Sequence, residues 1–228
     1  MSQSLPLPPY KKLSGSLLLF SPRILQVPMS ANHTPSRSKP RIYSIGHSNH
    51  TLERFLSLLK EHKIEVLVDT RSQPYSKYAP HFTGEYIKME LEKAGIPYLF
   101  LGKELGGRPE EPEFYDSEGH VLYWKLANSV TLREGIQRLE EESKVRRVAI
   151  MCSEENPSCC HRRLLIGRVL TSRGIELDHI RGNGQLQTED DLVSQEAQNS
   201  LFEQPEKAVW RSIQSVSQRG PRQSSSEH

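Results

Sequence analysis

The chain of 228 residues is 35% hydrophobic and 25% charged, and its formal net charge is +2. A chain of this size and composition can bury one ordinary globular core, which excludes disorder throughout. The longest apolar candidate, Leu17 to Phe20, is far shorter than the roughly 20 residues that span a bilayer, so we expect no membrane-spanning helix and no membrane partner.

Basic residues concentrate at the N-terminal end. Residues 1–40 carry five bases and no acid, residues 41–186 are neutral, and residues 187–228 carry seven acids against four bases. Residues 1–40 are also rich in Ser and Pro, so we expect a disordered extension; an organellar transit segment or a true start at Met29 fits the same composition. The neutral centre argues only weakly for a dedicated DNA binder, which usually carries a basic footprint.

All three cysteines lie within the stretch MCSEENPSCCHRR, Met151 to Arg163. They cannot form the distributed disulfide framework that stabilises small secreted domains. The apolar run near the N-terminus is also short for a secretory signal. We therefore expect a reducing, cytoplasmic setting.

Residues 41–186 alternate short apolar runs with helix-like stretches, which is typical of a single α/β domain. The runs that are too short and too rich in β-branched or aromatic residues for helices predict strands at 42–45, 65–69, 98–101, 147–151 and 176–180. Since helices separate most of these strands, the pattern predicts a Rossmann-like three-layer sandwich with a mostly parallel sheet of about five strands.

Amphipathic stretches between the strands predict the helices. TLERFLSLLKEH opens with Thr51 as an N-cap, and TLREGIQRLEEE places Thr131 and Glu134 at capping-box spacing. HRRLLIGRVLTSRG ends at Gly174, a residue that readily adopts the left-handed conformation that terminates helices.

A tail follows the domain over residues 187–228. A short helix at 205–216 could dock Val209, Trp210 and Ile213 on the domain. Residues 217–228 lack the means to bury a core, and we expect them to be disordered.

Unusual residues follow four of the predicted strands. Ligands of open parallel sheets bind outside the carboxyl ends of the strands, because the following loops and helix N-termini all point there. The segments that would meet at this edge are Gly46–His50, Asp69–Arg71, Gly102–Arg108 and Cys152–Arg163. Their convergence predicts a binding or catalytic site.

Each segment also has a purely structural interpretation. Gly46 could make a tight strand exit, His47 could cap a helix, Asp69 and Arg71 could form a local ion pair, and Gly106 with Gly107 could serve a turn. These alternatives remain open at the level of sequence.

The thiol segment carries the strongest chemistry. Cys152 lies between a strand end and a helix start, where N–H groups and the helix dipole lower a thiol pKa, and Arg162 and Arg163 could bind an anion there. The alternative is a small buried apolar cysteine. Metal binding by Cys152, Cys159 or Cys160 and His161 is a further alternative. A closed zinc site needs four ligands, however, and the sequence holds no second CxxC half, so we expect no metal.

Three ordered motifs resemble the family named domain of unknown function 488. They are YSIGHSNH, VDTRSQP and MCSEENPSCCHRR, and the resemblance covers roughly residues 42–180. It implies an α/β fold and, as family positions, the residues Gly46, His47, Ser48, Asp69, Arg71, Pro74, Gly106, Cys152, Glu154, Cys160, His161 and Arg162. Cys159 is incidental to the pattern. The strand, Cys, loop, Arg, helix order is only distantly similar to rhodaneses and cysteine-dependent phosphatases, whose loops are shorter.

The favoured function is an enzyme acting on a phosphate-bearing substrate, such as a nucleotide or nucleic acid. The catalytic candidates are Cys152, Glu154, His47 and Asp69. The candidates for substrate binding are Gly46, Ser48, Arg71, Gly106, Gly107, Cys160, His161 and Arg162. The sequence names no cofactor and no oligomeric state.

Two alternatives come from other classes of protein. A nucleic-acid or nucleotide-binding module in repair or regulation could use the basic N-terminal arm, Lys144–Arg147, and exposed Tyr75, Tyr78 and Phe82 as stacking residues. A thiol redox or metal sensor could instead close a disulfide between Cys152 and Cys160.

Overall fold

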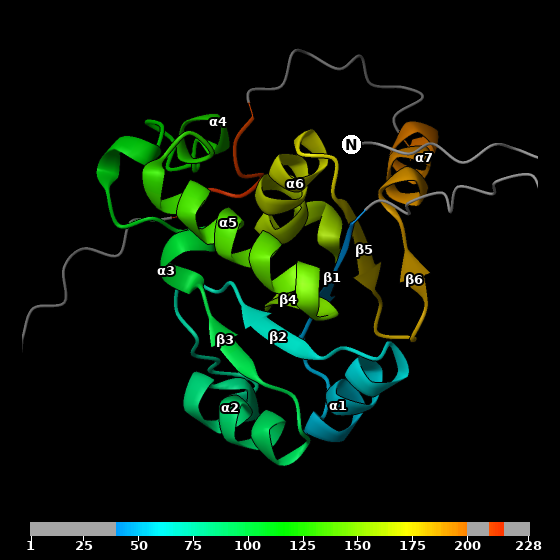
Figure 1. Ribbon diagram of the computed structural model, residues 1–228. Coiled ribbons are helices and arrows are strands. Elements are labelled where there is room, and N and C mark those ends of the chain that lie inside the picture. The colour runs from blue at the N-terminus through cyan, green and yellow to red at the C-terminus, as the bar shows by residue number, and fades with distance from the viewer. Residues whose placement is uncertain (1–39, 200–209, 217–228) are drawn as a thin grey trace, which may run out of the picture. The chain divides into compact units, whose positions relative to one another are not determined.

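A computed structural model describes residues 40–199 and 210–216 of the chain. Within these ranges a sheet of six strands has the order β3-β2-β4-β1-β5-β6 (Figure 1). The strands are β1 Arg41–Gly46, β2 Val66–Asp69, β3 Tyr98–Phe100, β4 Val148–Cys152, β5 Glu176–Ile180 and β6 Leu186–Gln187. The first five are parallel, and β6 runs antiparallel to β5. The five predicted strands are confirmed, and β6 is an addition.

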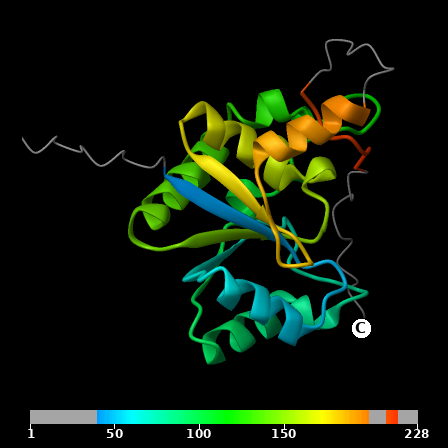
Figure 2. The ribbon, with the colours of Figure 1, turned by 90° about the vertical axis from the view of Figure 1, so that its right-hand side faces the viewer.

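Helices cover both faces of the sheet (Figures 1 and 2). One face carries α1 and α2, and the other carries α5 and a π-helical turn, η4, that continues into α6. The helices are α1 Leu52–Glu61, α2 Gly84–Lys93, α3 Gly102–Leu105, α4 Tyr123–Leu126, α5 Val130–Val145, η4 Arg162–Gly167, α6 Arg168–Ser172 and α7 Glu189–Asn199. This is the predicted three-layer α/β sandwich.

Alternating strand residues build the two cores. In β4, Val148 and Ile150 pack with α5 and α6, whereas Ala149 and Met151 pack with α1 and α2. Successive side chains of a strand point to opposite faces, so Cys152 continues the α5–α6 face. By the same alternation Asp69, two residues after Leu67, continues the α1–α2 face.

The position of β4 between β2 and β1 determines what meets at the carboxyl edge. Gly46 pairs with Cys152, and Asp69 pairs with Met151. The chain leaves β1 toward α1 and leaves β4 toward α6, so two adjacent parallel strands send their connections to opposite faces. Open α/β sheets bind ligands at such switch points, although a Rossmann order would place β1 beside β2.

The helix starts follow the local capping residues. The Thr51 side chain accepts a hydrogen bond from the Arg54 backbone N–H at 3.2 Å, as predicted for α1. The capping box predicted at Thr131 is wrong, because α5 begins at Val130 and the Ser129 hydroxyl caps it by accepting from the Leu132 N–H at 3.1 Å. Ser129 offers the same chemistry two residues earlier, which leaves Thr131 inside the first turn.

Residues 210–216 contain bends and no helix. The Trp210 indole donates to the Leu164 carbonyl at 2.6 Å, whereas Ile213 is 60% exposed. The remainder of the helix expected at 205–216, with Val209, lies outside the described residues, as do the extension 1–39 and the end 217–228. None of the helices within 40–199 and 210–216 has the length and apolar character needed to cross a membrane.

Candidate functional site

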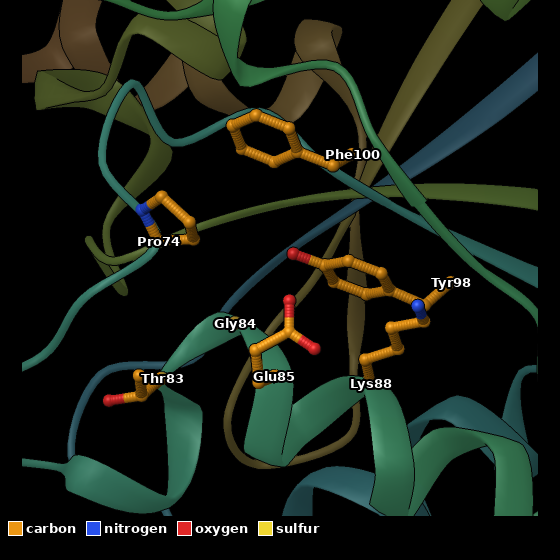
Figure 3. A pocket seen from close by; sticks show the side chains of 7 residues that line it. All are labelled: Pro74, Thr83, Gly84, Glu85, Lys88, Tyr98 and Phe100. Atoms are coloured by element: carbon orange, nitrogen blue, oxygen red, sulfur yellow. The ribbon is translucent and has the colours of Figure 1, made fainter.

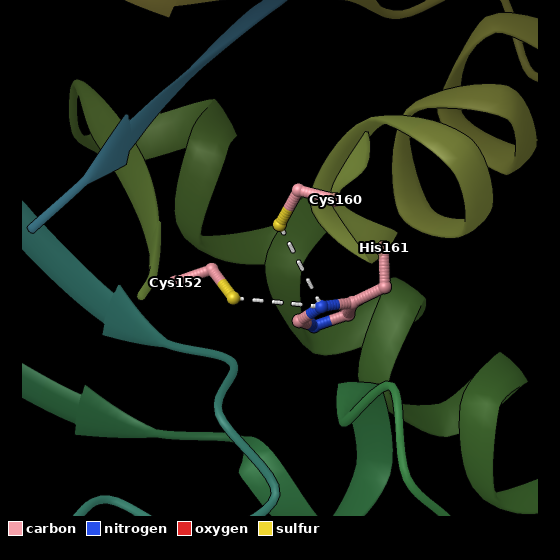
Figure 4. A group of neighbouring side chains, drawn as sticks. All are labelled: Cys152, Cys160 and His161. Carbon is pink, nitrogen blue, oxygen red and sulfur yellow. Dashed lines mark hydrogen bonds between the residues drawn. The ribbon is translucent and has the colours of Figure 1, made fainter. Parts of the chain in front are cut away.

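Three chemically reactive side chains meet where β4 ends. The Cys152 sulfur lies 3.6 Å from Nδ1 of His161, and the Cys160 sulfur lies 3.8 Å from the same atom (Figure 4). The two sulfurs and the ring nitrogen all lie within 4.8 Å of one another. Cys160 and Cys152 are 1% and 7% exposed and His161 is 9% exposed, so this thiol cluster is largely shielded from water.

The His161 ring is held on its far side by the chain after β2. Its Nε2 atom donates to the Thr70 carbonyl at 3.0 Å, which leaves Nδ1 directed at the sulfurs. Thr70 is itself fixed to β4, because its backbone N–H and its hydroxyl both donate to the Met151 carbonyl, at 3.0 and 2.9 Å. A Cβ on Gly107 would come within 2.7 Å of the ring, so the glycine backbone packs directly on His161.

The electrostatics of the cluster favour a thiolate at Cys152. A hydrogen bond from Cys160 and the positive charges of His161 and Arg162 hold the pKa of Cys152 well below its usual value, despite burial. Burial and the negative Cys152 raise the pKa of Cys160. Burial alone would lower the pKa of His161, but the Cys152 thiolate raises it. The directions of these pKa shifts favour a thiolate at Cys152, an imidazolium at His161 and a protonated thiol at Cys160.

A second polar network occupies the opposite face of the same edge. Asp69 is fully buried and accepts from Arg71 through the backbone N–H at 3.0 Å and through the guanidinium at 2.6 to 3.1 Å. The Tyr98 hydroxyl also donates to Asp69, at 2.8 Å. With its acceptor positions occupied by protein donors, Asp69 anchors Arg71 and the loop that follows it.

His47 belongs to this second network. Its Nδ1 donates to the Ser48 carbonyl at 2.9 Å, and its Nε2 accepts from Arg71 at 3.2 Å. Burial, reinforced by the Arg71 charge, lowers its pKa to about 4, so the ring is neutral near pH 7. The ring stacks on Phe82 with centroids 4.5 Å apart; Phe82 is fully buried, so its expected role as an exposed stacking residue is wrong.

Arg162 points inward from the start of η4. It is 1% exposed, and its guanidinium donates to the Glu154 carbonyl, to the Glu155 carbonyl at 2.6 Å and to the Ser44 hydroxyl at 3.2 Å. A Cβ on Gly46 would lie 1.9 Å from the Glu154 oxygen, so only glycine lets the loop lie there. Arg162 therefore holds the Glu154–Glu155 segment against the end of β1, and the glycine at position 46 leaves room for it.

The other predicted residues occupy varied positions. Ser48 has a positive φ of 46° and its N–H donates to the Ser153 carbonyl at 2.9 Å, while the Glu154 side chain is exposed. A Cβ on Gly106 would lie 2.3 Å from the Ser72 hydroxyl, which explains a glycine in that turn. Arg163 pairs with Glu189 and Glu196 of α7, at 2.7 and 2.5 Å.

The predicted residues therefore share an edge but form two groups. Cys152, Cys160 and His161 lie on the α5–α6 face, whereas His47, Asp69 and Arg71 continue the α1–α2 face. Thr70, which the sequence did not single out, connects the two groups through its carbonyl and its bonds to β4.

Tyr123 also lacked a clear sequence signal, and Arg108 was named only as the end of the segment Gly102–Arg108. Tyr123 is 4% exposed, and its pKa is raised by burial first and then by Cys160 and Cys152, with Arg108 opposing. Arg108 ends the glycine-rich loop, its side chain is exposed, and no carboxylate within 40–199 and 210–216 forms an ion pair with it.

A pocket of about 440 Å³ lies next to the second network (Figure 3). It is bounded by the residues Pro74, Thr83, Gly84, Glu85, Lys88, Tyr98 and Phe100. Tyr98 connects it to Asp69, but the thiols do not line it.

Two groups within the described ranges have donor atoms close enough to hold a metal ion. One is the thiol cluster, and the other combines Asp116, Glu118 and His120. In the second group Arg211 already forms ion pairs with both carboxylates, at 2.5 Å from Asp116 and 2.9 Å from Glu118. The thiol cluster is thus the better candidate.

The family model described as domain of unknown function DUF488 matches residues 51–169. The chain belongs to this family. The DUF488 match includes Thr70, the glycine-rich loop and the entire thiol cluster. Searches of curated proteins and of solved structures found no match. The DUF488 description specifies no activity, so functional inference rests on the geometry of the site.

Proposed function

We propose that this DUF488 protein is a thiol-dependent enzyme in which Cys152 is the nucleophile and His161 its proton-carrying partner. The supporting observation is the chain of contacts from the Cys152 sulfur to His161 Nδ1, 3.6 Å, and from His161 Nε2 to the Thr70 carbonyl, 3.0 Å. A nucleophile, a base and a third group that orients the base are the parts that activated-nucleophile catalysis requires.

The chemistry follows from these three positions. The Cys152 thiolate attacks an electrophilic phosphorus or carbon, the new bond to sulfur forms, and the bond to the leaving oxygen breaks. His161 donates its Nδ1 proton to that oxygen. His161 then takes a proton from water, whose oxygen displaces the sulfur and regenerates the thiolate. Cys160 supports the thiolate by hydrogen bonding to it.

We further propose that the substrate is anionic and phosphate-bearing, such as a nucleotide or a nucleic acid end. Arg162 and Arg71 contribute charge from buried positions, where their guanidinium groups already donate to protein acceptors. Arg108 is exposed, and it directly follows Gly107, whose backbone packs on the His161 ring. It is therefore the group we assign to binding the anion.

The anionic-substrate proposal is testable without knowing the substrate. Iodoacetate and iodoacetamide alkylate thiols by the same reaction but differ in charge, and peptide mass spectrometry reports Cys152 and the exposed Cys159 separately. We expect the iodoacetate-to-iodoacetamide rate ratio to be higher at Cys152 than at Cys159, and to fall in Arg108→Gln. Equal ratios at both thiols in the wild type would remove the anion-binding proposal.

Nucleic-acid binding is the second candidate, because two aromatic residues stand in solvent just after Arg71. Tyr75 and Tyr78 are 68% and 91% exposed, and the Lys77 ammonium lies 5.6 Å from the Tyr78 ring. Exposed rings with a neighbouring cation can stack unpaired bases. Gel shifts with single-stranded oligonucleotides support this role if a Tyr75→Ala, Tyr78→Ala double variant loses binding, and oppose it if the wild type shows none at low salt.

A further inference from the structure

In the thiol cluster two sulfurs approach one ring nitrogen, and proton transfer alone does not explain this arrangement. Both sulfurs lie within hydrogen-bonding distance of the same nitrogen, at 3.6 and 3.8 Å from His161 Nδ1. A ring nitrogen carries one proton or one lone pair in the ring plane, so it serves one sulfur at a time. A cation between the three atoms would contact all of them at once.

The spacing of the donors suits a tetrahedral metal ion. Zinc binds sulfur at about 2.3 Å and imidazole nitrogen at about 2.0–2.1 Å, so neighbouring ligand atoms lie about 3.5–3.8 Å apart. The observed sulfur–nitrogen distances are 3.6 and 3.8 Å, and all three atoms fall within 4.8 Å of one another. Figure 4 shows the side chains converging on one point from β4 and from the start of η4.

The surroundings of the donors resemble those of metal sites. Metal-binding histidines usually donate the other ring N–H to a carbonyl or carboxylate, which fixes the ring. His161 donates Nε2–H to the Thr70 carbonyl at 3.0 Å, and the Gly107 backbone packs on the ring.

We propose that Cys152, Cys160 and His161 form a three-ligand site for a borderline-soft divalent cation such as Zn²⁺, whose fourth coordination position is open. A closed structural zinc site needs four protein ligands, but three are the usual number in an open one. Two thiolates and an imidazole favour zinc over magnesium or calcium, which require oxygen ligands. The slight exposure of Cys152 and His161, with Cys160 enclosed, places the open position toward solvent.

This site deepens the proposed function, and its regulatory meaning rests on that function. A bound cation shares the Cys152 lone pairs and withdraws them from an electrophile. Zinc and substrate therefore compete for one sulfur, so the metal-bound protein is an inactive, protected form. The metal site itself stands on the geometry of the three donors.

Cobalt titration tests the site directly. The full chain is reduced with a non-thiol phosphine, stripped with chelator and titrated with Co²⁺, whose thiolate complexes absorb strongly in the near ultraviolet. We expect the band to saturate at one Co²⁺ per chain, to vanish on adding Zn²⁺ and to persist in Cys159→Ser, which alters only the exposed neighbour. Cys160→Ser, with folding checked by circular dichroism, should lower the affinity roughly tenfold or more.

Co²⁺ binding without the thiolate band, as the carboxylates near His120 would give, overturns the metal proposal. A band of equal affinity in Cys160→Ser does so too. A wild-type experiment needs no variant: one Zn²⁺ per chain should slow Cys152 alkylation at least tenfold, reversibly with chelator, and no slowing contradicts the site.

The two proposals fail separately. If no thiolate band forms while the metal-free Cys152 ionises at low pH, the metal site fails and the enzyme proposal stands. If the band forms while the metal-free Cys152 ionises like Cys159, the enzyme proposal fails and the metal site stands.

Discussion

His161 follows Cys152 by nine positions, yet its Nδ1 atom lies 3.6 Å from the Cys152 sulfur. The intervening loop turns back because Arg162 binds the Glu154 and Glu155 carbonyls and because Gly46 leaves room for them. The pair is thus a product of long-range packing rather than of local spacing.

Replacing His161 should raise the pKa of Cys152. In His161→Gln the imidazolium is gone, and a thiol with a pKa of about 8.5 is only about 3% ionised at pH 7. The Cys160 hydrogen bond and the Arg162 charge remain in this variant, so we expect alkylation of Cys152 at pH 7 to slow by up to roughly thirtyfold, with the rate recovering as the pH rises above 8. An unchanged pH profile would show that His161 does not ionise the thiol.

Gly46→Ala should destabilise the fold. The added Cβ would lie 1.9 Å from the Glu154 oxygen, which is backbone and cannot rotate away. Overpacking typically costs about 1–3 kcal/mol, and we expect a decrease in the free energy of unfolding at the upper end of that range. Gly84→Ala is the control, because its Cβ would come no closer than 3.1 Å to the Pro74 side chain and 3.5 Å to the Pro74 carbonyl oxygen. Equal denaturant midpoints in the two variants would contradict the close approach.

Much of the sheet could be predicted from the sequence because its buried strands are short runs of β-branched and aromatic residues between amphipathic helices. The meeting of Gly46, Asp69 and Cys152 at one edge followed from the parallel arrangement. Strand β6, Leu186–Gln187, is too short to leave a pattern.

The face on which each site residue lies could not be predicted. It depends on the register of β2 and β4 and on the place of β4 in the sheet, which are tertiary properties. The buried orientation of the Arg162 side chain could not be predicted either, because the carbonyls that it binds belong to a loop with no regular sequence pattern. Sequence reasoning assigned Arg162 to an anion; its bonds assign it to the loop.

Arg162→Met should release the Glu154–Glu155 loop from the sheet and destabilise the fold. The variant leaves the partly buried Glu154 and Glu155 carbonyls without this donor, and an unpaired carbonyl costs up to about 1–3 kcal/mol when it is buried. We therefore expect a loss of about 3 kcal/mol in the free energy of unfolding. Arg173→Met removes an exposed ion pair with Glu140 and should cost less than about 1 kcal/mol. Losses of similar size in chemical denaturation would refute the anchoring role.

His47 should make the fold sensitive to acid. Its folded pKa is about 4 against 6.5 for the free side chain, so between these values the unfolded chain binds a proton that the folded chain excludes. Stability is therefore retained above pH 6.5 and lost as the pH falls toward 4, by about 3 kcal/mol for this residue. Urea unfolding at several pH values should show a shallower loss in His47→Gln; parallel curves would mean that His47 titrates normally.

The most direct test of the thiol enzyme is the pH at which Cys152 ionises. Alkylation of the reduced, metal-free wild type by iodoacetamide is followed from pH 4 to 10, with Cys152, Cys159 and Cys160 quantified in the same digest. The midpoint of each profile is compared rather than the absolute rate, because burial slows the access of the reagent to a thiol at every pH. We expect the midpoint of Cys152 well below that of exposed Cys159, and that of Cys160 above it. A Cys152 midpoint equal to or higher than that of Cys159 would contradict a thiolate nucleophile at this site.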